Sequence, residues 1–218
     1  VLDATKYAGA KEAYVVEEPF AAAVGAGLPV QDPTGSMIVD IGGGTTDVAT
    51  ISLGGIVNSQ SIRIGGDELN EAIVLHVRKK YNLLIGERTA EDLKIQLGSA
   101  SVEKSSAYGS MQVRGRDMVS GLPRIIEVEA VEIAEAMSEI ITQIIDAVRD
   151  VLEQTPPEIA SDVIDHGIVL TGGGALLRNL AEVISDYTQV PAFVANDPLD
   201  CVALGTGKIL ANPLLMKK

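Results

Sequence analysis

The amino-acid sequence predicts an α/β protein with a mixed sheet and flanking helices, on three observations. First, β-branched runs on both sides of Gly54-Gly55 indicate two strands joined by a tight turn. Second, residues 130–153 contain no Gly or Pro and carry apolar side chains at helical spacing. Third, the apolar run 167–171 precedes a glycine triplet and an amphipathic segment, which is typical of a β–turn–α unit. Hairpins combined with β–α units favour a mixed sheet over a purely parallel one.

The first part of the chain predicts short elements bounded by glycine and proline. Residues 1–8 indicate a helix and residues 13–17 a strand. The segment from Pro19 indicates a short helix, since proline is favoured at the first helical position. A loop rich in Pro, Gly and Asp then leads into a strand at 36–41, which the two strands around 54–55 follow.

The middle of the chain predicts helices, a loop and a hairpin. One helix is expected from Asp67 to about Tyr81, and a second near Thr89, where TAED matches a capping box. The polar run 99–110 predicts a surface loop. The segments flanking 121–123 predict a hairpin, and the apolar stripe of 130–153 indicates core packing.

The last part of the chain predicts two strands and two helices. Pro156-Pro157 ends the long helix. The strand at 167–171 leads into a glycine turn that is expected to open a helix. A strand at 191–195 and a final helix at 199–212 complete the expected order.

Composition and charge narrow the classes of function. The 218 residues are 46% hydrophobic, which is enough to bury a core, and the formal net charge is -13. Because so acidic a surface repels phosphates, we expect no nucleic-acid partner. His76 and His166 lack companions at zinc-ligand spacing, and Cys201, without a basic neighbour, is expected to be a small buried side chain.

The glycine triplet 42–44 lies between two strand-like runs, in the sequence DIGGGTTD. This placement excludes the P-loop and the Rossmann fingerprint, which both need a helix directly after the glycines. A hairpin tip without side chains exposes backbone N–H groups that can bind a phosphate. Asp40 would place a carboxylate beside that phosphate, which favours an intervening Mg²⁺ ion, and Thr45 and Thr46 add hydroxyls. For this triplet taken alone, a turn without a ligand is the alternative.

A second triplet, 172–174, follows the strand at 167–171 and precedes a helix-like pattern. A helix N-terminus offers free N–H groups, and glycines allow a ring or a ribose to approach the backbone. This triplet is also a weak signal by itself. The two together form a more specific pair.

Several segments resemble the MreB family of bacterial actin homologues, namely DIGGGTTDVA, IRIGGDELNEAI, GERTAEDLKIQLG, RGRDMVSGLPR, LEQTPPE and LTGGGALL. The resemblance runs from residue 1 to about residue 210, and only 99–110 is irregular. It implies the actin-like ATPase fold shared with sugar kinases and heat-shock chaperone ATPases. In this fold a ribonuclease H-like mixed sheet and its helices form two halves that enclose Mg-ATP.

The resemblance also implies a domain organisation. Residues 1–35, with the final helix 199–212, would be a remnant of the first ATPase half. Residues 36–66 and 164–196 would form the core of the second half, and 67–162 an inserted smaller α+β subdomain. The family's D-x-G-T phosphate hairpin, its filament-lining subdomain and its membrane-anchoring segments are not in this sequence, so we expect an N-terminally truncated chain.

The resemblance assigns a catalytic role to Glu18, which precedes the Pro-x-Ala-Ala-Ala helix. A helix N-terminus favours the ionised carboxylate, which can orient and partly deprotonate the water that attacks the γ-phosphate. Thr45 would hold the other side of that water. One alternative is that Glu18 only caps the helix. Another is that Glu17 is the catalytic carboxylate, although alternation along the expected strand 13–17 places Glu17 on the opposite face of that strand.

The implied nucleotide contacts include Glu91 at the ribose and the Lys94 stem along the adenine. A surface ion pair between these two side chains is the alternative. Asp40 is the implied metal ligand. The implied nucleotide-binding residues are Gly42, Gly43, Gly44, Thr45, Thr46, Glu91, Asp92, Leu93, Lys94, Thr171, Gly172, Gly173 and Gly174.

The function implied by the resemblance is that of an ATP-binding, filament-forming protein that organises cell-wall synthesis and maintains rod shape. Its cofactors would be ATP and Mg²⁺. Its partners would be further copies of itself and membrane-associated cell-wall elongation proteins, at the cytoplasmic face of the membrane. ATP hydrolysis to ADP is expected of the full-length protein and not of this chain alone.

Other proteins of the same fold remain alternatives. A sugar kinase would need a catalytic Asp facing a sugar pocket and a specific polar cluster, which the sequence does not display. A chaperone ATPase would need an interdomain linker and a substrate domain, which the printed sequence does not contain. A soluble ATPase that forms no filament is the remaining possibility.

Overall fold

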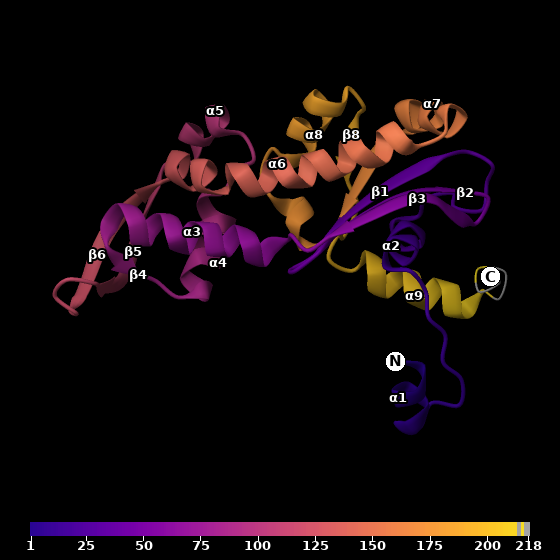
Figure 1. The fold of residues 1–218 in the computed structure, drawn as a ribbon, viewed down its shortest axis with the longest axis horizontal. Coiled ribbons are helices and arrows are strands. Elements are labelled where there is room, and N and C mark those ends of the chain that lie inside the picture. Colours follow the sequence, from indigo (N-terminus) through magenta and orange to yellow (C-terminus); the bar gives the residue numbers. More distant parts are fainter. Residues whose placement is uncertain (213–214, 216–218) are drawn as a thin grey trace.

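The computed structural model describes residues 1–212 and residue 215, which form two β-sheets joined by helices (Figure 1). The strands are β1 (Ser36–Ile41), β2 (Thr46–Ser52), β3 (Gly55–Ile62), β4 (Leu83–Leu84), β5 (Ser110–Asp117), β6 (Pro123–Glu129), β7 (Ile168–Thr171) and β8 (Ala192–Val194). The α-helices are α1 (Leu2–Tyr7), α2 (Glu18–Ala26), α3 (Gly66–Tyr81), α4 (Glu87–Leu97), α5 (Val102–Ser105), α6 (Ala130–Gln154), α7 (Pro157–His166), α8 (Leu180–Thr188) and α9 (Cys201–Ala211). Two 3-10 helices, η1 (Ser106–Tyr108) and η2 (Gly173–Leu176), complete the described elements.

The larger sheet is mixed, as predicted, with strand order β3-β2-β1-β7-β8. β1 pairs with β2 in antiparallel orientation and with β7 in parallel orientation. All six residues of β1 are buried, because helices cover both faces of the sheet. Val39 and Ile41 pack on one face against residues of α6, whereas Ile38 packs on the other face against α2. This alternation follows from the two-residue period of a strand.

The smaller sheet has the order β4-β5-β6 and lies, in sequence, between β3 and β7 of the larger sheet. β5 and β6 form the hairpin predicted around residues 121–123. α3, α4 and α6 connect the region of this sheet to the larger one (Figure 1). α6 confirms the predicted stripe: Ile133, Met137 and Ile144 are buried, in a hydrophobic core that extends to both sheets.

α2 and α9 pack closely on the face of the larger sheet opposite α6 (Figure 1). Two glycines make this contact possible. A Cβ atom on Gly25 would lie 1.7 Å from the carbonyl oxygen of Cys201, and one on Gly205 would lie 1.8 Å from that of Ala21. Cys201 is fully buried in this contact, as the sequence predicts.

Four sequence predictions differ from the structure. Residues 13–17 are not a strand, because no strand in the described part of the chain pairs with them. The run 99–110 is not a loop but contains α5, η1 and the start of β5, since the Ser101 hydroxyl accepts the backbone N–H of Lys104 and caps a helix there. α4 begins at Glu87, so Thr89 lies inside the helix and does not cap it. The glycine turn at 172–174 opens the 3-10 helix η2, and α8 begins only at Leu180.

No helix among the described residues has both the length and the apolar character that crossing a membrane requires. α1 buries none of its residues and lies apart from the sheets (Figure 1).

Candidate functional site

A cavity of about 700 Å³ lies where the β1–β2 hairpin tip, the N-terminus of α3, α4, η2 and the start of α9 converge. These elements come from widely separated parts of the sequence. Nine of the predicted site residues line the cavity, namely Glu18, Asp40, Gly42, Gly43, Glu91, Lys94, Gly172, Gly173 and Gly174. The structure therefore brings together in one cavity the two glycine triplets and the candidate carboxylates.

The hairpin tip at 42–44 is docked on the N-terminus of α3. The carbonyl oxygen of Gly42 accepts the N–H of Gly66 at 3.0 Å, and that of Gly43 accepts the N–H of Asp67 at 2.7 Å. These bonds satisfy two of the N–H groups that a helix N-terminus leaves unpaired. They also fix the orientation of the tip relative to the cavity.

Neither backbone conformation nor packing requires glycine at 43 and 44. Both residues have φ outside the left-handed region. A Cβ on Gly43 would make only ordinary contacts, at 3.5 Å from the nearest Asp67 oxygen, and one on Gly44 would meet nothing within 4 Å. The N–H groups of both glycines donate to no group in the described part of the chain. The N–H of Gly42 donates to the carbonyl oxygen of Thr45 at 2.8 Å, so the tip presents the unpaired donors of Gly43 and Gly44, as an anion-binding tip would.

Asp40 is buried at the end of β1, with only 4% of its surface exposed. Burial raises the pKa of its carboxyl to about 6, and the nearby Glu18 and Asp47 carboxylates add to the rise. The hydroxyl of Thr171, which donates to Asp40 Oδ1 at 3.0 Å, acts in the opposite direction on this pKa. A buried carboxylate without a cationic partner is costly, and a bound cation would remove that cost.

Asp40 has no cluster of further ligands around it. Among the described residues, no group of three or more His, Cys, Asp or Glu side chains could hold a metal ion. One carboxylate, with phosphate oxygens and water completing the shell, is the usual way in which a protein binds Mg²⁺ beside a nucleotide. The donor set around Asp40 fits that mode of binding.

The second triplet differs from the first, because the fold itself requires glycine at 172 and 174. Gly172 has φ +79°, and a Cβ there would lie 2.2 Å from the carbonyl oxygen of Ile41. A Cβ on Gly174 would lie 2.2 Å from Ile41 Cγ2. These glycines let η2 pack against the end of β1 at the cavity wall.

Lys94 reaches across the cavity wall from α4 to the start of α3. Its Nζ donates to the carbonyl oxygen of Gly66 at 2.9 Å, and burial lowers the pKa of the ammonium group. The nearby carboxylates of Glu91 and Asp67 oppose this shift. The alternative of a Glu91–Lys94 ion pair is not seen, since the ion pairs of the described residues do not include it.

Glu18 is the first residue of α2 and lines the cavity. α2 has no side-chain capping hydrogen bond, so neither Glu18 nor the N-cap residue Glu17 acts as a cap. The Glu18 carboxylate is close enough to Asp40 to raise its pKa. It is therefore a carboxylate on the cavity wall that has no structural hydrogen bond.

The other predicted residues lie around the cavity and not on its wall. Thr46 is buried and its hydroxyl donates to the carbonyl oxygen of Ile64 at 2.7 Å. Leu93 belongs to the hydrophobic core, and Asp92 is exposed. The remaining members of this group are Gly44 and Thr45 in the hairpin and Thr171 behind Asp40.

Residues that sequence reasoning did not single out complete the wall. Asp67 and Asn70 come from the first two turns of α3, where their spacing after Gly66 could have indicated them. Arg178 follows η2, and no sequence pattern indicated it. Apolar side chains form another part of the wall, namely Ile95, Leu176, Leu177, Leu199 and Val202.

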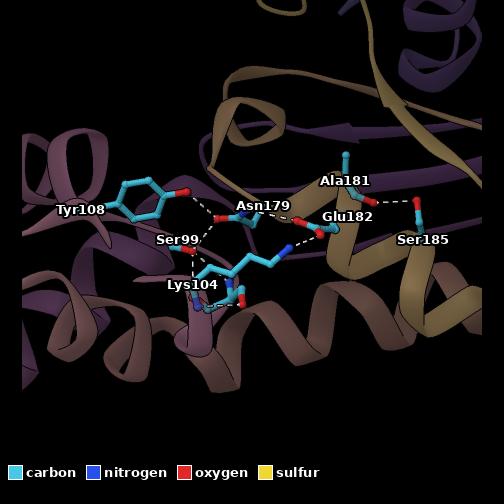
Figure 2. Close-up of polar contacts among 8 residues, drawn as sticks. Ser99, Lys104, Tyr108, Asn179, Ala181, Glu182 and Ser185 are labelled. Atoms are coloured by element: carbon cyan, nitrogen blue, oxygen red, sulfur yellow. Dashed lines mark hydrogen bonds and ion pairs between the residues drawn. The ribbon is translucent and has the colours of Figure 1, made fainter. Parts of the chain in front are cut away.

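Beside the cavity, a polar cluster joins the segment before β5 to α8, as Figure 2 shows. Asn179 Oδ1 accepts hydrogen bonds from the hydroxyls of Tyr108 at 2.8 Å and Ser99 at 3.0 Å. Its Nδ2 donates to Glu182, which also pairs with Lys104. We call these five residues the clasp.

Arg178 connects the clasp to the cavity. Its guanidinium donates to the carbonyl oxygens of Gln96 at 2.9 Å and Gly98 at 3.4 Å, at the end of α4. It also lies over the Tyr108 ring, 4.8 Å from the centroid. The C-terminal end of the helix that carries Glu91 and Lys94 is thus held to the segment between η2 and α8.

Comparison with known proteins gives a consistent result. The family model for the MreB/Mbl protein matches residues 1–218. The cell shape-determining protein MreB of Escherichia coli is 53% identical over 210 residues, which are 96% of this chain and 60% of that protein. The cell shape-determining protein Mbl of Bacillus subtilis is 49% identical over 212 residues, which are 97% of this chain and 63% of that protein. The chain therefore spans about 60% of the length of these relatives.

Solved structures agree with the sequence comparison. MreB5 of Spiroplasma citri bound to ADP superposes with a TM-score of 0.90 at 42% identity, covering 95% of this chain and 62% of that one. The same protein bound to AMPPNP matches equally well. The MamK double helical filament matches with a TM-score of 0.74 at 22% identity, over 91% of this chain and 59% of that one, which is a likeness of fold. The predicted actin-like fold is confirmed.

Proposed function

Because the chain belongs to the MreB/Mbl family, we propose that it carries most of the ATP- and Mg²⁺-binding site of an actin-like, filament-forming protein that maintains rod cell shape. One observation supports this proposal above all others. Residues from Glu18 to Gly174 that are far apart in sequence line a single cavity of about 700 Å³, a volume typical of ligand sites.

The hairpin tip and Asp40 form the phosphate side of the proposed site. The unpaired N–H groups of Gly43 and Gly44 would donate to phosphate oxygens, and Thr45 and Thr46 belong to the same hairpin. Asp40, oriented by Thr171, would hold the Mg²⁺ ion. When bound, this ion would neutralise charge on the phosphates.

α4, η2 and the start of α9 form the nucleoside side. The apolar side chains Leu176, Leu177 and Leu199 suit a flat base, and the tight packing of Gly172 and Gly174 keeps the backbone of η2 close to it. Glu91 would accept a ribose hydroxyl, and the Lys94 stem would lie along the adenine. Asp92 and Leu93, in the same turn of α4, would act by positioning these two.

Glu18 would position the water that attacks the γ-phosphate. Its carboxylate lies on the cavity wall without a structural hydrogen bond, which leaves it free to accept a proton from water. Thr45 would hold that water from the side of the hairpin. ATP hydrolysis to ADP is proposed for the full-length protein.

The wider function is proposed for the whole protein, of which this chain matches about 60% in its relatives. Its partners would be further copies of itself and membrane-associated cell-wall elongation proteins at the cytoplasmic face of the membrane. The fold shared with the MamK filament supports self-assembly. A soluble ATPase or sugar kinase of the same fold would bind nucleotide without sedimenting as filaments.

Titration calorimetry of the full-length protein with ATP, with and without Mg²⁺, tests the site. Gly43→Val should abolish ATP binding and leave the fold intact. The added Cβ meets only ordinary contacts inside the protein, whereas the new side chain would crowd the backbone N–H groups that are proposed to bind the phosphate. Glu71→Gln, at an exposed residue of α3 that does not line the cavity, is the control and should bind as the wild type does. Unchanged affinity in Gly43→Val would show that the hairpin is not the phosphate cradle.

A further inference from the structure

Asn70 is a buried amide on the wall of the cavity. It lies in the second turn of α3, and 8% of its surface is exposed. Its Oδ1 is buried without a hydrogen-bond partner, and its Nδ2 donates to no group in the described part of the chain. Both the donor and the acceptor of this side chain are therefore unused by the fold.

The fold gives no reason for an amide at this position. The neighbouring core residues Leu69 and Ile73, on the same helix, are apolar and almost fully buried. Asn is a weaker helix former than Leu, and a buried amide without hydrogen bonds destabilises a protein. A leucine of similar shape would satisfy the packing better. The amide is explained if a ligand in the cavity supplies its hydrogen bonds.

We propose that Asn70 binds a ribose hydroxyl of the nucleotide, an inference that rests on the proposed function. A hydroxyl both donates and accepts, which matches the amide, whereas phosphate oxygens only accept and would leave Oδ1 unpaired. Asn70 lies one helical turn after Gly66, whose carbonyl oxygen accepts the Lys94 ammonium, so it shares the α3–α4 side of the cavity with Lys94, and Glu91 lines the cavity from the same helix as Lys94. Asn70 thus determines specificity for the sugar.

The test compares ATP, 2′-deoxy-ATP and 3′-deoxy-ATP on full-length wild type and Asn70→Leu by titration calorimetry. Asn70→Leu should bind ATP about 2- to 10-fold more weakly, the range expected for a lost hydrogen bond. For the deoxynucleotide that lacks the hydroxyl in contact with Asn70, the substitution should cause no further loss. Equal losses for all three nucleotides, or no loss for ATP, would overturn the proposal.

Contact with the base edge is a separate outcome. If the loss persists with both deoxynucleotides but vanishes with purine riboside triphosphate, which lacks the 6-amino group, Asn70 reads the base and the ribose assignment is wrong. If wild type does not bind ATP at all, the proposed function itself fails. If wild type binds and Asn70→Leu binds equally well, only the role of Asn70 fails.

Thermal unfolding of the nucleotide-free proteins separates a binding role from a structural one. Asn70→Leu should unfold at the same temperature as wild type or at a higher one, because the substitution removes an unpaired buried amide. A lower unfolding temperature would indicate a structural role. Asn70→Ala provides a second variant should the larger side chain disturb α3, and Glu71→Gln, an exposed neighbour, should change neither affinity nor stability.

Discussion

At the scale of single residues, the two glycine triplets share a sequence, but the physical reason for glycine differs between them. The packing of the protein requires glycine at 172 and 174, because a side chain at either position would collide with Ile41. Gly43 and Gly44 have free space around them and ordinary backbone angles. Ordering a glycine costs more backbone entropy than ordering another residue. The glycines at the hairpin tip are therefore better explained by a ligand that binds there than by packing within the protein.

Asp40 should destabilise the protein in the absence of Mg²⁺ and nucleotide. Its pKa is raised from 3.8 to about 6, so its protonated form is favoured in the fold. The contribution of Asp40 to the free energy of unfolding is then most favourable below about pH 4 and falls as the pH rises to about 6. Asp40→Asn removes this cost and should raise the free energy of unfolding at pH 7 by on the order of 1–3 kcal/mol.

The measurement is thermal or urea unfolding of wild type and Asp40→Asn between pH 4 and pH 8, without Mg²⁺. The gain should be largest above pH 6 and should disappear near pH 4, where Asp40 is protonated. Asp92→Asn, at an exposed site on α4, should show no such gain. If Asp40→Asn were less stable than wild type at pH 7, the buried Asp40 carboxylate would not be the destabilising group that we infer.

At the scale of elements, the contact between α2 and α9 fixes Glu18 relative to the larger sheet. Glu18 is the first residue of α2, and α2 packs on β1 and β2 as well as on α9. The helices approach closely because Gly25 and Gly205 have no side chain at the contact. The Lys208 ammonium also donates to the carbonyl oxygens of Val24 and Gly25 at the end of α2.

Gly205→Ala should destabilise this helix pair strongly, because the new Cβ would lie 1.8 Å from the carbonyl oxygen of Ala21. Overpacking of this kind costs about 1–3 kcal/mol or more. Gly207→Ala is the matched control on the same helix, where a Cβ meets nothing within 4 Å. It should be neutral or stabilising by up to about 1 kcal/mol, since Ala is the better helix former. Urea unfolding measures the change in the free energy of unfolding for both variants. Equal changes in Gly205→Ala and Gly207→Ala would show that the helices are not in close contact at Gly205.

The clasp fixes the position of cavity-lining elements in the same way as the α2–α9 contact fixes Glu18. Asn179 and Tyr108 tie α8 to the segment before β5, and Arg178 ties the same region to the end of α4. α4, which carries Glu91, is thus held to the segment that follows Gly173 by side-chain contacts as well as by the shared hydrophobic core. This arrangement keeps the proposed nucleoside side of the cavity in one shape.

At the scale of the whole molecule, α3 and α6 connect the two sheet-containing regions (Figure 1). The cavity is lined by the end of β1 and by residues of α2, α3, α4, η2 and α9. Asp40 on β1 and Gly43 in the β1–β2 turn, which are proposed to bind the phosphates, line the same cavity as Glu18 of α2. Apolar side chains are exposed near Glu18 and on α9, including Val15, Leu204 and Leu210. Exposed apolar surface of this kind favours association.

Residues 1–218 by themselves should neither hydrolyse ATP nor form ordered filaments. The chain spans about 60% of the length of its relatives, and phosphoryl transfer requires the γ-phosphate to be held from both sides. Self-association through the exposed apolar side chains should give irregular aggregates. Phosphate release and sedimentation with electron microscopy check both expectations. Measured turnover by the purified chain, abolished in Glu18→Ala, would overturn them.

Much of the site could be predicted from the sequence, because short motifs determine it. The stretch DIGGGTTD predicted a hairpin with the Asp40 carboxylate beside a glycine tip that has no side chains. The spacing of Glu91 and Lys94 predicted that both lie on one turn of a helix, and this helix lines the cavity. Residues 13–17 were mispredicted as a strand, since β-propensity cannot supply a partner strand. No sequence pattern indicated Arg178, and the sequence could not show that the Asn70 amide lacks a partner.

The sequence by itself determined the elements, since apolar periodicity and turn residues act over a few positions along the chain. It predicted β1, β2 and the buried stripe of α6, and it marked both glycine triplets. Only the tertiary structure decided that Gly172 is constrained by Ile41, that Thr46 is committed to Ile64, and that the Asn70 amide has no partner. These properties depend on contacts between segments distant in sequence, where burial and the count of hydrogen-bond partners are set by the packing of the whole molecule.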